Sequence, residues 1–342
     1  KPCWLNLKLH VTLLDSLPLN LPLTQRPKPM GKWLAPLFVA TLVPRVTALR
    51  LSAATQSRAV QRPARIFTVY DEAFDPIVEV WRSCLAEAIP WPHPWVRVEA
   101  VPMESQVKEA RQTALLQLDR RIPPHSLART VVEQWLVRLS EADTMHIDSD
   151  AFVLKEPLEL TARAHPEADI VAAVDCAYDP PACGWYRTAK YLVRHSWQDP
   201  LAARGFMLNT GFMHVRKSPD TLWLMQRTLD RVSRGANEQV AFNEELLELD
   251  CQWKTARGGP VPQGTAALEF LQEQEIHGAC VNGTGQPIRL VVLPYSLVPR
   301  GVDAAYGRGS VGPHSLAYHP GGVLDHKVDE LPRVNLLCHR SG

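Results

Sequence analysis

The sequence has no Cys-x-x-Cys spacing, no internal repeat and little net charge. Without closely spaced cysteine pairs, neither a zinc site nor a thioredoxin-type site has support. Ten basic residues and a single acid, Asp15, occupy residues 1–65, which leaves 27 basic and 35 acidic residues in 66–342. The net charge of −8 over that main part argues against a nucleic-acid-binding protein, which needs a basic face for phosphates.

The N-terminal part has no apolar run long enough for a membrane span. Residues 33–43 form an apolar run of 11 residues after Met30 and Lys32, with small residues following. A membrane span needs about 20 residues, so the pattern is typical of a secretory signal. An organelle transit peptide is the competing interpretation, because residues 45–65 contain no acid. We therefore expect four parts: 1–29 outside the mature protein, 30–53 a signal peptide or short signal-anchor, 54–65 a linker, and 66–342 a single domain.

The cysteines are few but even in number once the leader is set aside. Removing Cys3 leaves six: Cys84, Cys176, Cys183, Cys251, Cys280 and Cys338. An even set is what disulfides in an oxidising lumen require. The glycosylation sequon at residues 282–284 is consistent with the same compartment, so the sequence predicts the ER or Golgi lumen.

From residue 66 onward, strand patterns alternate with helix patterns. Strands are predicted at 66–70, 95–101, 144–147, 168–175, 206–215 (interrupted by Asn-Thr-Gly) and 289–294, and helices at 75–88, 105–118, from 126, 220–233 and 238–249. Leu127, Val131, Trp135 and Leu139 form one apolar stripe, and 179–185 and 301–322 resemble loops. The alternation predicts an α/β domain with a mostly parallel, Rossmann-type sheet and helices on both faces.

Two aspartates follow the predicted strand 144–147, in the sequence "HIDSDAF". Ligands of such sheets bind outside the carboxyl ends of the strands, where Asp148 and Asp150 lie. An EF-hand loop is rejected because Phe152 and Val153 stand where a ligand and the obligatory glycine belong. A phosphatase of the aspartyl-nucleophile type usually has a small hydroxyl residue soon after its second aspartate, whereas Ala151, Phe152 and Val153 follow Asp150 here. A plain turn and a divalent cation shared with a substrate diphosphate both remain open from this pair alone.

Three later segments accompany the aspartates in a familiar order: "LNTGFMHVR" (208–216), "NEQVAFNEEL" (237–246) and "HPGGVLDHK" (319–327). Together with the aspartates they resemble the nucleotide-diphospho-sugar transferase family, glycosyltransferases of the GT-A fold. The closest type resembles plant and algal cell-wall arabinosyl- and xylosyltransferases. The resemblance covers roughly 66–339.

The resemblance implies a metal centre. Asp150 would ligate the cation, Asp148 would touch either the metal or the donor ribose, and His319 would be the third ligand. An imidazole suits Mn²⁺ better than Mg²⁺. Lys327 would approach the diphosphate, although its spacing from His319 is longer than the tight version of this element.

The resemblance also implies a substrate site. Asn209 and Gln239 would orient the sugar and are the expected catalytic residues. The other expected substrate contacts are Thr210 and Gly211 beside the sugar, Glu238 (where the family has Asp), Asn243 one turn after Gln239, Arg129 near the phosphates, and Thr68 and Tyr70 at the base.

The expected function is metal-dependent transfer of a sugar, with retention, from a nucleoside-diphosphate donor such as a UDP-sugar to a glycan or glycoprotein acceptor. A membrane contact would exist only if the leader stays as an anchor. Two alternatives remain open: a protein that binds carbohydrate or nucleotide on the same fold without turnover, and a metal-dependent phosphohydrolase.

Overall fold

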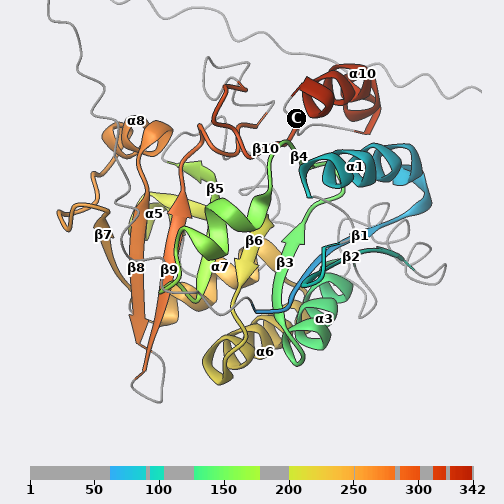
Figure 1. The fold of residues 1–342 in the computed structure, drawn as a ribbon. Helices are drawn as coiled ribbons and strands as arrows, with labels where there is room; N and C mark the ends of the chain where they lie inside the picture. Colours follow the sequence, from blue (N-terminus) through green and yellow to red (C-terminus); the bar gives the residue numbers. More distant parts are fainter. Residues whose placement is uncertain are drawn as a thin grey trace, which may run out of the picture. The chain divides into compact units, whose positions relative to one another are not determined.

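A central sheet of eight strands organises the part of the chain that the computed structural model describes (Figure 1). The described residues are 62–89, 93–103, 127–177, 200–249, 251–281, 286–300, 311–320 and 324–340. The strand order is β2-β1-β3-β6-β5-β9-β8-β7. The strands are β1 (Ala64–Tyr70), β2 (Val96–Pro102), β3 (Asp143–Ile147), β5 (Ile170–Ala177), β6 (Phe206–Val215), β7 (Gln252–Thr255), β8 (Ile276–Val281) and β9 (Pro287–Leu293).

Most strands of the sheet point the same way. β1 pairs in parallel with β2 and β3, and β5 pairs in parallel with β9. β6 is antiparallel to β3 and β5, and β8 is antiparallel to β7 and β9. Only β6 and β8 therefore oppose the other strands, which confirms the predicted mostly parallel α/β sheet.

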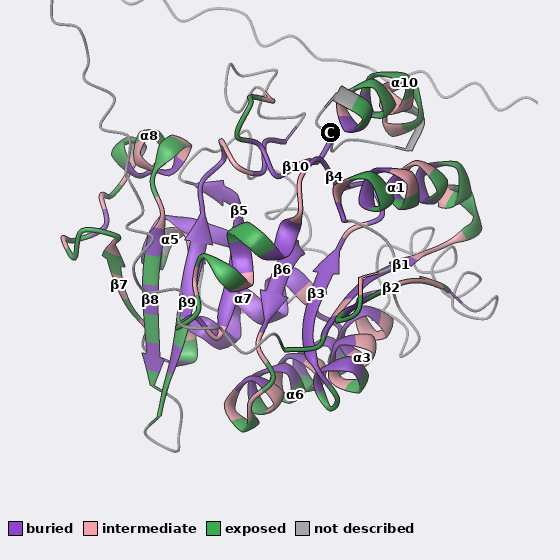
Figure 2. Cartoon of the chain, in the orientation of Figure 1, coloured by how far each residue is buried: buried purple, intermediate pink, exposed green. Residues whose placement is uncertain are grey.

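Helices cover both faces of this sheet, as predicted. They are α1 (Asp75–Ala88), α3 (Leu127–Leu139), α5 (Pro200–Arg204), α6 (Pro219–Ser233), α7 (Glu238–Glu248), α8 (Thr265–Glu273) and α10 (Leu324–Arg340), with short helices η1 (Glu72–Phe74) and η2 (Glu159–Arg163). Side chains of α3, α6 and α7 join one apolar core, and those of α1 and α10 join the other. The central strands between the two cores are buried along most of their length (Figure 2).

The predicted apolar stripe explains how α3 sits on the sheet. Val131, Trp135 and Leu139 are buried in the first core, and Leu127 packs against it from a partly buried position. The sequence pair Asp75-Pro76 predicts that Asp75 is the N-cap of its helix, with proline at the first helical position. The structure corrects this: Asp75 is the first residue of α1, and Phe74 is the N-cap. The predicted helix 105–118 and loop 179–185 lie outside the described residues.

Strand β6 contains an irregularity where the sequence reads Asn-Thr-Gly. In its pairing with β5, Ala172 is opposite Met213 but the next residue, Ala173, is opposite Asn209. The residues between those partners, 210–212, bulge away from β5. On the other side of β6, Phe212 pairs with Ile147 of β3. The interruption predicted from the sequence is thus a bulge within a continuous strand.

A second, small sheet ties distant parts of the chain together. β4 (Phe152–Val153) pairs with β10 (Ala317–Tyr318), with Phe152 opposite Tyr318. β10 lies within the region 301–322 that was expected to be loop, so that expectation was wrong at Ala317 and Tyr318. Residues 301–310 lie outside the described part.

Two disulfides reinforce the described domain. Cys84 of α1 is bonded to Cys338 of α10 across 254 residues, and Cys251 is bonded to Cys280. Cys176 is disulfide-bonded as well, and Cys183 lies outside the described residues. Cross-links that close long loops restrict the unfolded chain most. The bonds indicate an oxidising environment, as the even cysteine set predicted.

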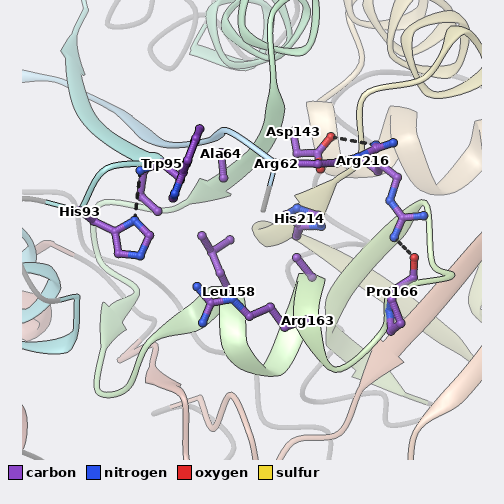
Figure 3. A pocket seen from close by; sticks show the side chains of 12 residues that line it. Arg62, Ala64, His93, Trp95, Asp143, Leu158, Arg163, Pro166, His214 and Arg216 are labelled. Atoms are coloured by element: carbon purple, nitrogen blue, oxygen red, sulfur yellow. Dashed lines mark hydrogen bonds and ion pairs between the residues drawn. The ribbon is translucent and has the colours of Figure 1, made fainter. Parts of the chain in front are cut away.

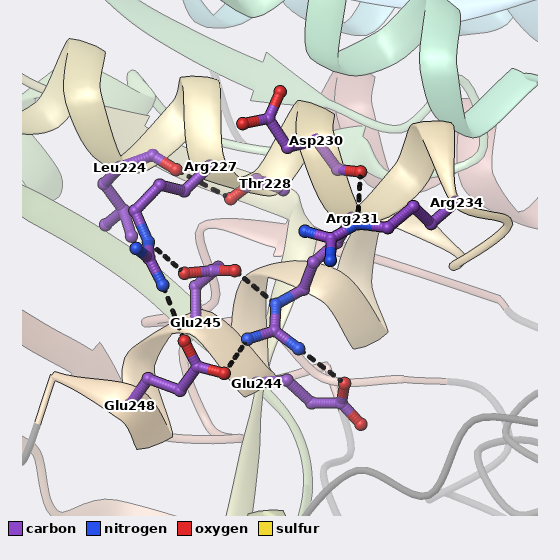
Figure 4. Close-up of polar contacts among 9 residues, drawn as sticks. All are labelled: Leu224, Arg227, Thr228, Asp230, Arg231, Arg234, Glu244, Glu245 and Glu248. Carbon is purple, nitrogen blue, oxygen red and sulfur yellow. Dashed lines mark hydrogen bonds and ion pairs between the residues drawn. The ribbon is translucent and has the colours of Figure 1, made fainter.

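Helices α6 and α7 are joined by a network of charged side chains (Figure 4). Arg231 forms short ion pairs with Glu245 and Glu248, and its guanidinium also lies 3.5 Å from the Glu244 carboxylate. Arg227 contacts the same two helix-α7 acids, Glu245 at 2.5 Å and Glu248 at 2.6 Å. The pKa of Arg231 is raised, because the bonds to its acids outweigh the opposing effect of burial. The network fixes α7, whose N-terminal turn carries Gln239.

Among the described residues, no helix combines the length and the apolar character of a membrane span. The expected leader, 1–53, and most of the expected linker lie outside the described residues, as does the sequon at 282–284. The first strand begins at Ala64, two residues before the predicted start.

Candidate metal centre and substrate site

The carboxylate pair lies directly beyond the end of β3. Asp148 N–H donates to the Gly211 carbonyl of β6 at 2.7 Å, which extends the pairing of the two strands by one residue. The chain then turns, and Ala151 N–H donates to the Asp148 carbonyl at 2.9 Å. The turn interpretation is therefore correct for the backbone. It leaves the carboxylates of Asp148 and Asp150 available for a second role.

His319 joins the two aspartates from the far end of the sequence. Pairing of β10 with β4 places it beside Asp150, and His319 N–H donates to the Pro299 carbonyl at 3.0 Å. One carboxylate oxygen each from Asp148 and Asp150 and one ring nitrogen of His319 lie within 4.8 Å of one another. His319 Nε2 is 3.2 Å from Asp150 Oδ2. The three residues predicted as metal ligands are thus brought together.

Lys327, in the first turns of α10, points at the same carboxylate. Its Nζ lies 2.5 Å from Asp150 Oδ2 and 5.4 Å from the centre of the Phe74 ring. Burial alone would raise the pKa of the Asp150 carboxyl, but the charges and hydrogen bonds of His319 and Lys327 hold it well below its usual range. Asp150 is therefore an ionised carboxylate only 5% exposed. The Lys327 ammonium group therefore occupies a position beside Asp150 that would also attract a metal cation.

Gly211 provides the space in which Asp148 lies. A Cβ built at this glycine would be 1.8 Å from Asp148 Oδ2 and 2.2 Å from its carboxyl carbon. No other residue type fits without displacing the carboxylate. The glycine also accepts the Asp148 N–H bond, so both parts of Asp148 depend on position 211.

Both the oxygen and the nitrogen of the Asn209 side-chain amide are hydrogen-bonded. Its Oδ1 accepts from Gly211 N–H at 2.6 Å, and its Nδ2 donates to Asp175 Oδ1 at 3.3 Å. Asp175 in turn lies 2.5 Å from Arg300 Nη1. Sequence reasoning missed Asp175 and Arg300; the signal available was an aspartate near the end of an otherwise apolar strand, "ADIVAAVD". These contacts give Asn209 a role in shaping the bulge under Asp148.

Gln239 reaches the same bulge from α7. Its Oε1 accepts from Thr210 N–H at 3.1 Å, while the Thr210 carbonyl accepts from His146 Nδ1 at 2.9 Å. The latter contact fixes the proton of His146 on Nδ1, and its Nε2 then faces Asp148 Oδ1 at 3.8 Å. Burial lowers the pKa of His146, opposed by Asp148 and the Thr210 carbonyl. A chain of contacts thus runs from α7 to the metal centre.

Asn243 is buried between α7 and β6, with its side-chain amide hydrogen-bonded to the backbone. It is 0% exposed, and its amide bonds the backbone N–H and carbonyl of Leu208, each at 2.9 Å. Nδ2 also donates to the Gln239 carbonyl at 2.7 Å. In this structure Asn243 fixes β6 against α7, and its expected sugar contact stays a prediction.

The remaining expected substrate residues are placed as follows. Thr68 is fully buried two residues before the end of β1, with Tyr70 half-buried as its last residue. Arg129 Nε donates to Glu133 one turn later in α3, at 2.7 Å. Glu238 is half-buried at the start of α7 and accepts from Asn237 Nδ2 at 2.9 Å. None of these contacts tests the expected role.

Comparison with known families supplies the class of this site. Residues 138–296 match the family model described as nucleotide-diphospho-sugar transferase. This part of the chain is similar to the nucleotide-diphospho-sugar transferases. The expected assignment to glycosyltransferases is thereby confirmed, while the narrower resemblance to plant and algal cell-wall enzymes stays a prediction. The match includes Asp148, Asp150, Asn209 and Gln239, and ends before His319 and Lys327.

Solved glycosyltransferase structures are among those found similar to the chain, all at low identity and low TM-score. The galactosyltransferase LgtC, in complex with donor and acceptor sugar analogs, is 12% identical with a TM-score of 0.35, over 81% of this chain and 95% of that one. GlyE of Streptococcus pneumoniae TIGR4 is 11% identical with a TM-score of 0.32, and the match covers 53% of this chain and 42% of that one. The mannosyltransferase PcManGT from Pyrobaculum calidifontis, solved with GDP-Man and Mn²⁺, is 13% identical with a TM-score of 0.27, over 82% and 74% of the two chains. No curated protein matches the chain.

The residues of the transferase site fit a divalent cation. Two carboxylates and one imidazole converge, an arrangement whose oxygen-rich donors suit hard cations and whose nitrogen donor suits first-row metals. The buried, ionised Asp150 already attracts the Lys327 ammonium, which shows that the site stabilises positive charge. A cation bound here would have to share or displace that lysine contact.

Proposed function

We propose that the protein is a metal-dependent glycosyltransferase that moves a sugar from a UDP-sugar to a glycan or glycoprotein acceptor. The observation that carries this proposal is the convergence of Asp148, Asp150 and His319 beside Lys327, at the end of β3 in a chain similar to the nucleotide-diphospho-sugar transferases. Carboxylates with an imidazole favour Mn²⁺ over Mg²⁺ as the resident ion.

The first group of proposed roles concerns the metal and the donor diphosphate. Asp148, Asp150 and His319 would hold the cation, which supplies Lewis-acid stabilisation of the departing diphosphate. Lys327 would add a positive charge to the same phosphates once it leaves Asp150. Arg129 is proposed as a further phosphate contact, with Thr68 and Tyr70 near the base.

On the sugar side, the proposal rests on the bulge of β6. Gly211 allows the backbone to approach closely, and Asn209 and Gln239 hold Thr210 and Gly211 in their observed positions. We assign Asn209 and Gln239 to orientation of the donor sugar, mainly through positioning and electrostatics, with Thr210 and Glu238 beside them. Transfer with retention follows from the family resemblance, and the disulfides support an ER or Golgi lumen as the compartment.

Thermal stabilisation by nucleotide tests the binding half of the proposal. With Mn²⁺ present, UDP is expected to raise the melting temperature of the full chain, and Asp150→Ala is expected to abolish the shift. Asp329→Ala is the matched control, an exposed aspartate of the same helix as Lys327. Absence of any response to a panel of nucleoside diphosphates would overturn the proposal.

Turnover distinguishes the transferase from the two alternatives. Release of UDP from a UDP-sugar that depends on a glycan acceptor supports transfer. Tight UDP binding without release would instead identify a binding protein, for which Glu238 in the family's aspartate position provides a reason. In that case Glu238→Asp is the variant to assay. Phosphate release from a simple phosphomonoester would favour the phosphohydrolase.

A further inference from the structure

A cavity of about 460 Å³, whose lining side chains are drawn in Figure 3, lies at the end of the sheet where β1, β2 and β3 begin. The candidate metal centre lies beyond the opposite end of β3. The lining of the cavity includes Ala64, Val96 and Asp143, the residues at which β1, β2 and β3 begin. Asp143 opens the same strand that ends at Asp148. The volume is within the range of roughly 300–1,000 Å³ typical of small-molecule sites.

His214 is the least explained side chain in this cavity. It is 1% exposed, and neither ring nitrogen has a hydrogen-bond partner among the described residues. Burial, reinforced by the charge of Arg216, lowers the pKa of His214 to about 3, so the ring is neutral. A neutral imidazole offers one donor and one acceptor. Leaving both unused in the interior is unfavourable, and a ligand with a hydroxyl and an acceptor oxygen would use both.

The charges around the cavity favour a single negative charge on that ligand. Arg163 is paired with Glu156 and Glu159, and Arg62 lies 3.8 Å from Asp143. Arg216 Nη2 donates to the neutral Pro166 carbonyl, and within the described residues the guanidinium has no carboxylate within ion-pair distance. Arg216 is therefore the cation left for a ligand carboxylate.

Trp95, His93 and an apolar wall complete the recognition surface. Trp95 is 45% exposed and borders the cavity, so its ring can stack on a flat or puckered ring. Trp95 N–H donates to His93 Nδ1 at 3.3 Å, which leaves the His93 Nε2–H free to donate when that ring is neutral. Leu158 and Ala162 provide an apolar wall on the η2 side.

We propose that this cavity is a second binding site, separate from the transferase site, for a hydroxylated ring carboxylate such as a uronic acid unit of an acidic glycan. The carboxylate would pair with Arg216, the ring would stack on Trp95, and a hydroxyl would bond to His214. The metal centre contributes no residue to this site. His214 follows Gly211 by three residues along β6, which is roughly 10 Å in a strand.

The test is ligand-detected NMR on the full chain with four probes: glucuronate, glucose, benzoate and sulfate. Saturable binding of glucuronate is expected, with clearly weaker binding of glucose (no charge), benzoate (no hydroxyl) and sulfate (no ring). Equal binding of benzoate would overturn the assignment to a sugar acid. Equal binding of sulfate would reduce the site to a general anion site.

Single substitutions test whether glucuronate binds in this cavity and whether its binding is independent of the transferase site. Arg216→Gln and Trp95→Ala are each expected to weaken glucuronate binding about tenfold or more, the effect of one charge-assisted or stacking contact. Because Trp95 is exposed, its variant keeps the fold, which a melting curve would verify. Asp150→Ala, and saturation with UDP and Mn²⁺, should leave glucuronate binding unchanged. Glucuronate binding that is absent in the wild type, insensitive to both variants, or lost in Asp150→Ala would overturn the proposal.

Discussion

The carboxylate of Asp148 occupies the space that any side chain at position 211 would need. A Cβ at Gly211 would lie 1.8 Å from Asp148 Oδ2, well inside van der Waals contact. The two residues are 63 positions apart in the sequence and are joined by the pairing of β3 with β6. Position 211 therefore controls where the more exposed carboxylate of the proposed metal centre points.

Replacement of this glycine gives the first prediction. Gly211→Ala is expected to displace Asp148 and to reduce transferase turnover by on the order of a hundredfold, the usual effect of misplacing an active-site group by about 1 Å. Initial rates with a UDP-sugar would measure the loss. The matched control is Gly259→Ala, because the nearest atom to a Cβ there is Thr255 Oγ1 at 3.4 Å and the contact is an ordinary one. A Gly211→Ala enzyme with unchanged rates would contradict the assigned role.

The lysine contact on Asp150 gives the second prediction. Lys327→Met removes the ammonium from Asp150 Oδ2, so Mn²⁺ affinity without nucleotide is expected to rise while UDP affinity falls. His319→Ala removes a ligand instead, and both affinities are expected to fall. Calorimetric titration of Mn²⁺, followed by titration of UDP, distinguishes the two patterns. If Lys327→Met lowers Mn²⁺ affinity, the lysine does not compete with the cation.

The buried imidazole of His214 makes stability depend on pH. Its pKa is about 3 in the folded protein against an ordinary value of 6.5, so in this interval the unfolded chain binds a proton that the folded protein does not. The stability that comes with a neutral His214 is fully present above about pH 7. It is lost as the pH falls toward 3, because the unfolded chain takes up the proton first. Between about pH 6.5 and 4.5 this ring alone should lower the free energy of unfolding by about 2–3 kcal/mol.

His214→Phe tests that dependence. The variant is expected to lose less stability between about pH 7 and 4.5 than the wild type, measured by urea unfolding. It is also expected to be at least as stable as the wild type at neutral pH, since two unused polar atoms are removed from the interior. His339→Phe, at an exposed position of α10, controls for the loss of a histidine as such. Identical pH slopes for wild type and His214→Phe would refute the assignment.

The network between α6 and α7 gives the fourth prediction. Arg231 has a side chain 7% exposed and contacts three glutamates of α7, whereas Arg227 is 38% exposed. Arg231→Met leaves buried acids without their main partner and should cost about 3–5 kcal/mol of unfolding free energy. Arg227→Met should cost about 1 kcal/mol or less, as is usual for exposed pairs. Equal losses in urea unfolding would show that burial does not set the strength of this network.

The sequence alone predicted the layered α/β fold for a local reason. Apolar periodicity distinguishes strands from helices residue by residue, so β1, β3, β5, α3 and α6 could be predicted close to their observed bounds. The position of Asp148 and Asp150 followed from the same pattern, because they come directly after a buried strand. The family motifs added the expectation of a glycosyltransferase, which the family match supports.

Only the tertiary structure decided which side chains meet and which are already engaged. His319 comes to Asp150 through the pairing of β10 with β4, and two residues on each strand give too weak a local signal to predict. Asn243 and Gln239 lie on the same face of α7, but they have different partners in β6. The Asn243 amide is hydrogen-bonded to the backbone of Leu208, whereas Gln239 accepts from Thr210 N–H. The periodic pattern identified His214 only as part of a strand; its burial without a partner depends on η2 and the starts of three strands closing around it. Hydrogen-bond satisfaction is a property of the assembled interior, so it cannot be obtained from the order of residues along the chain.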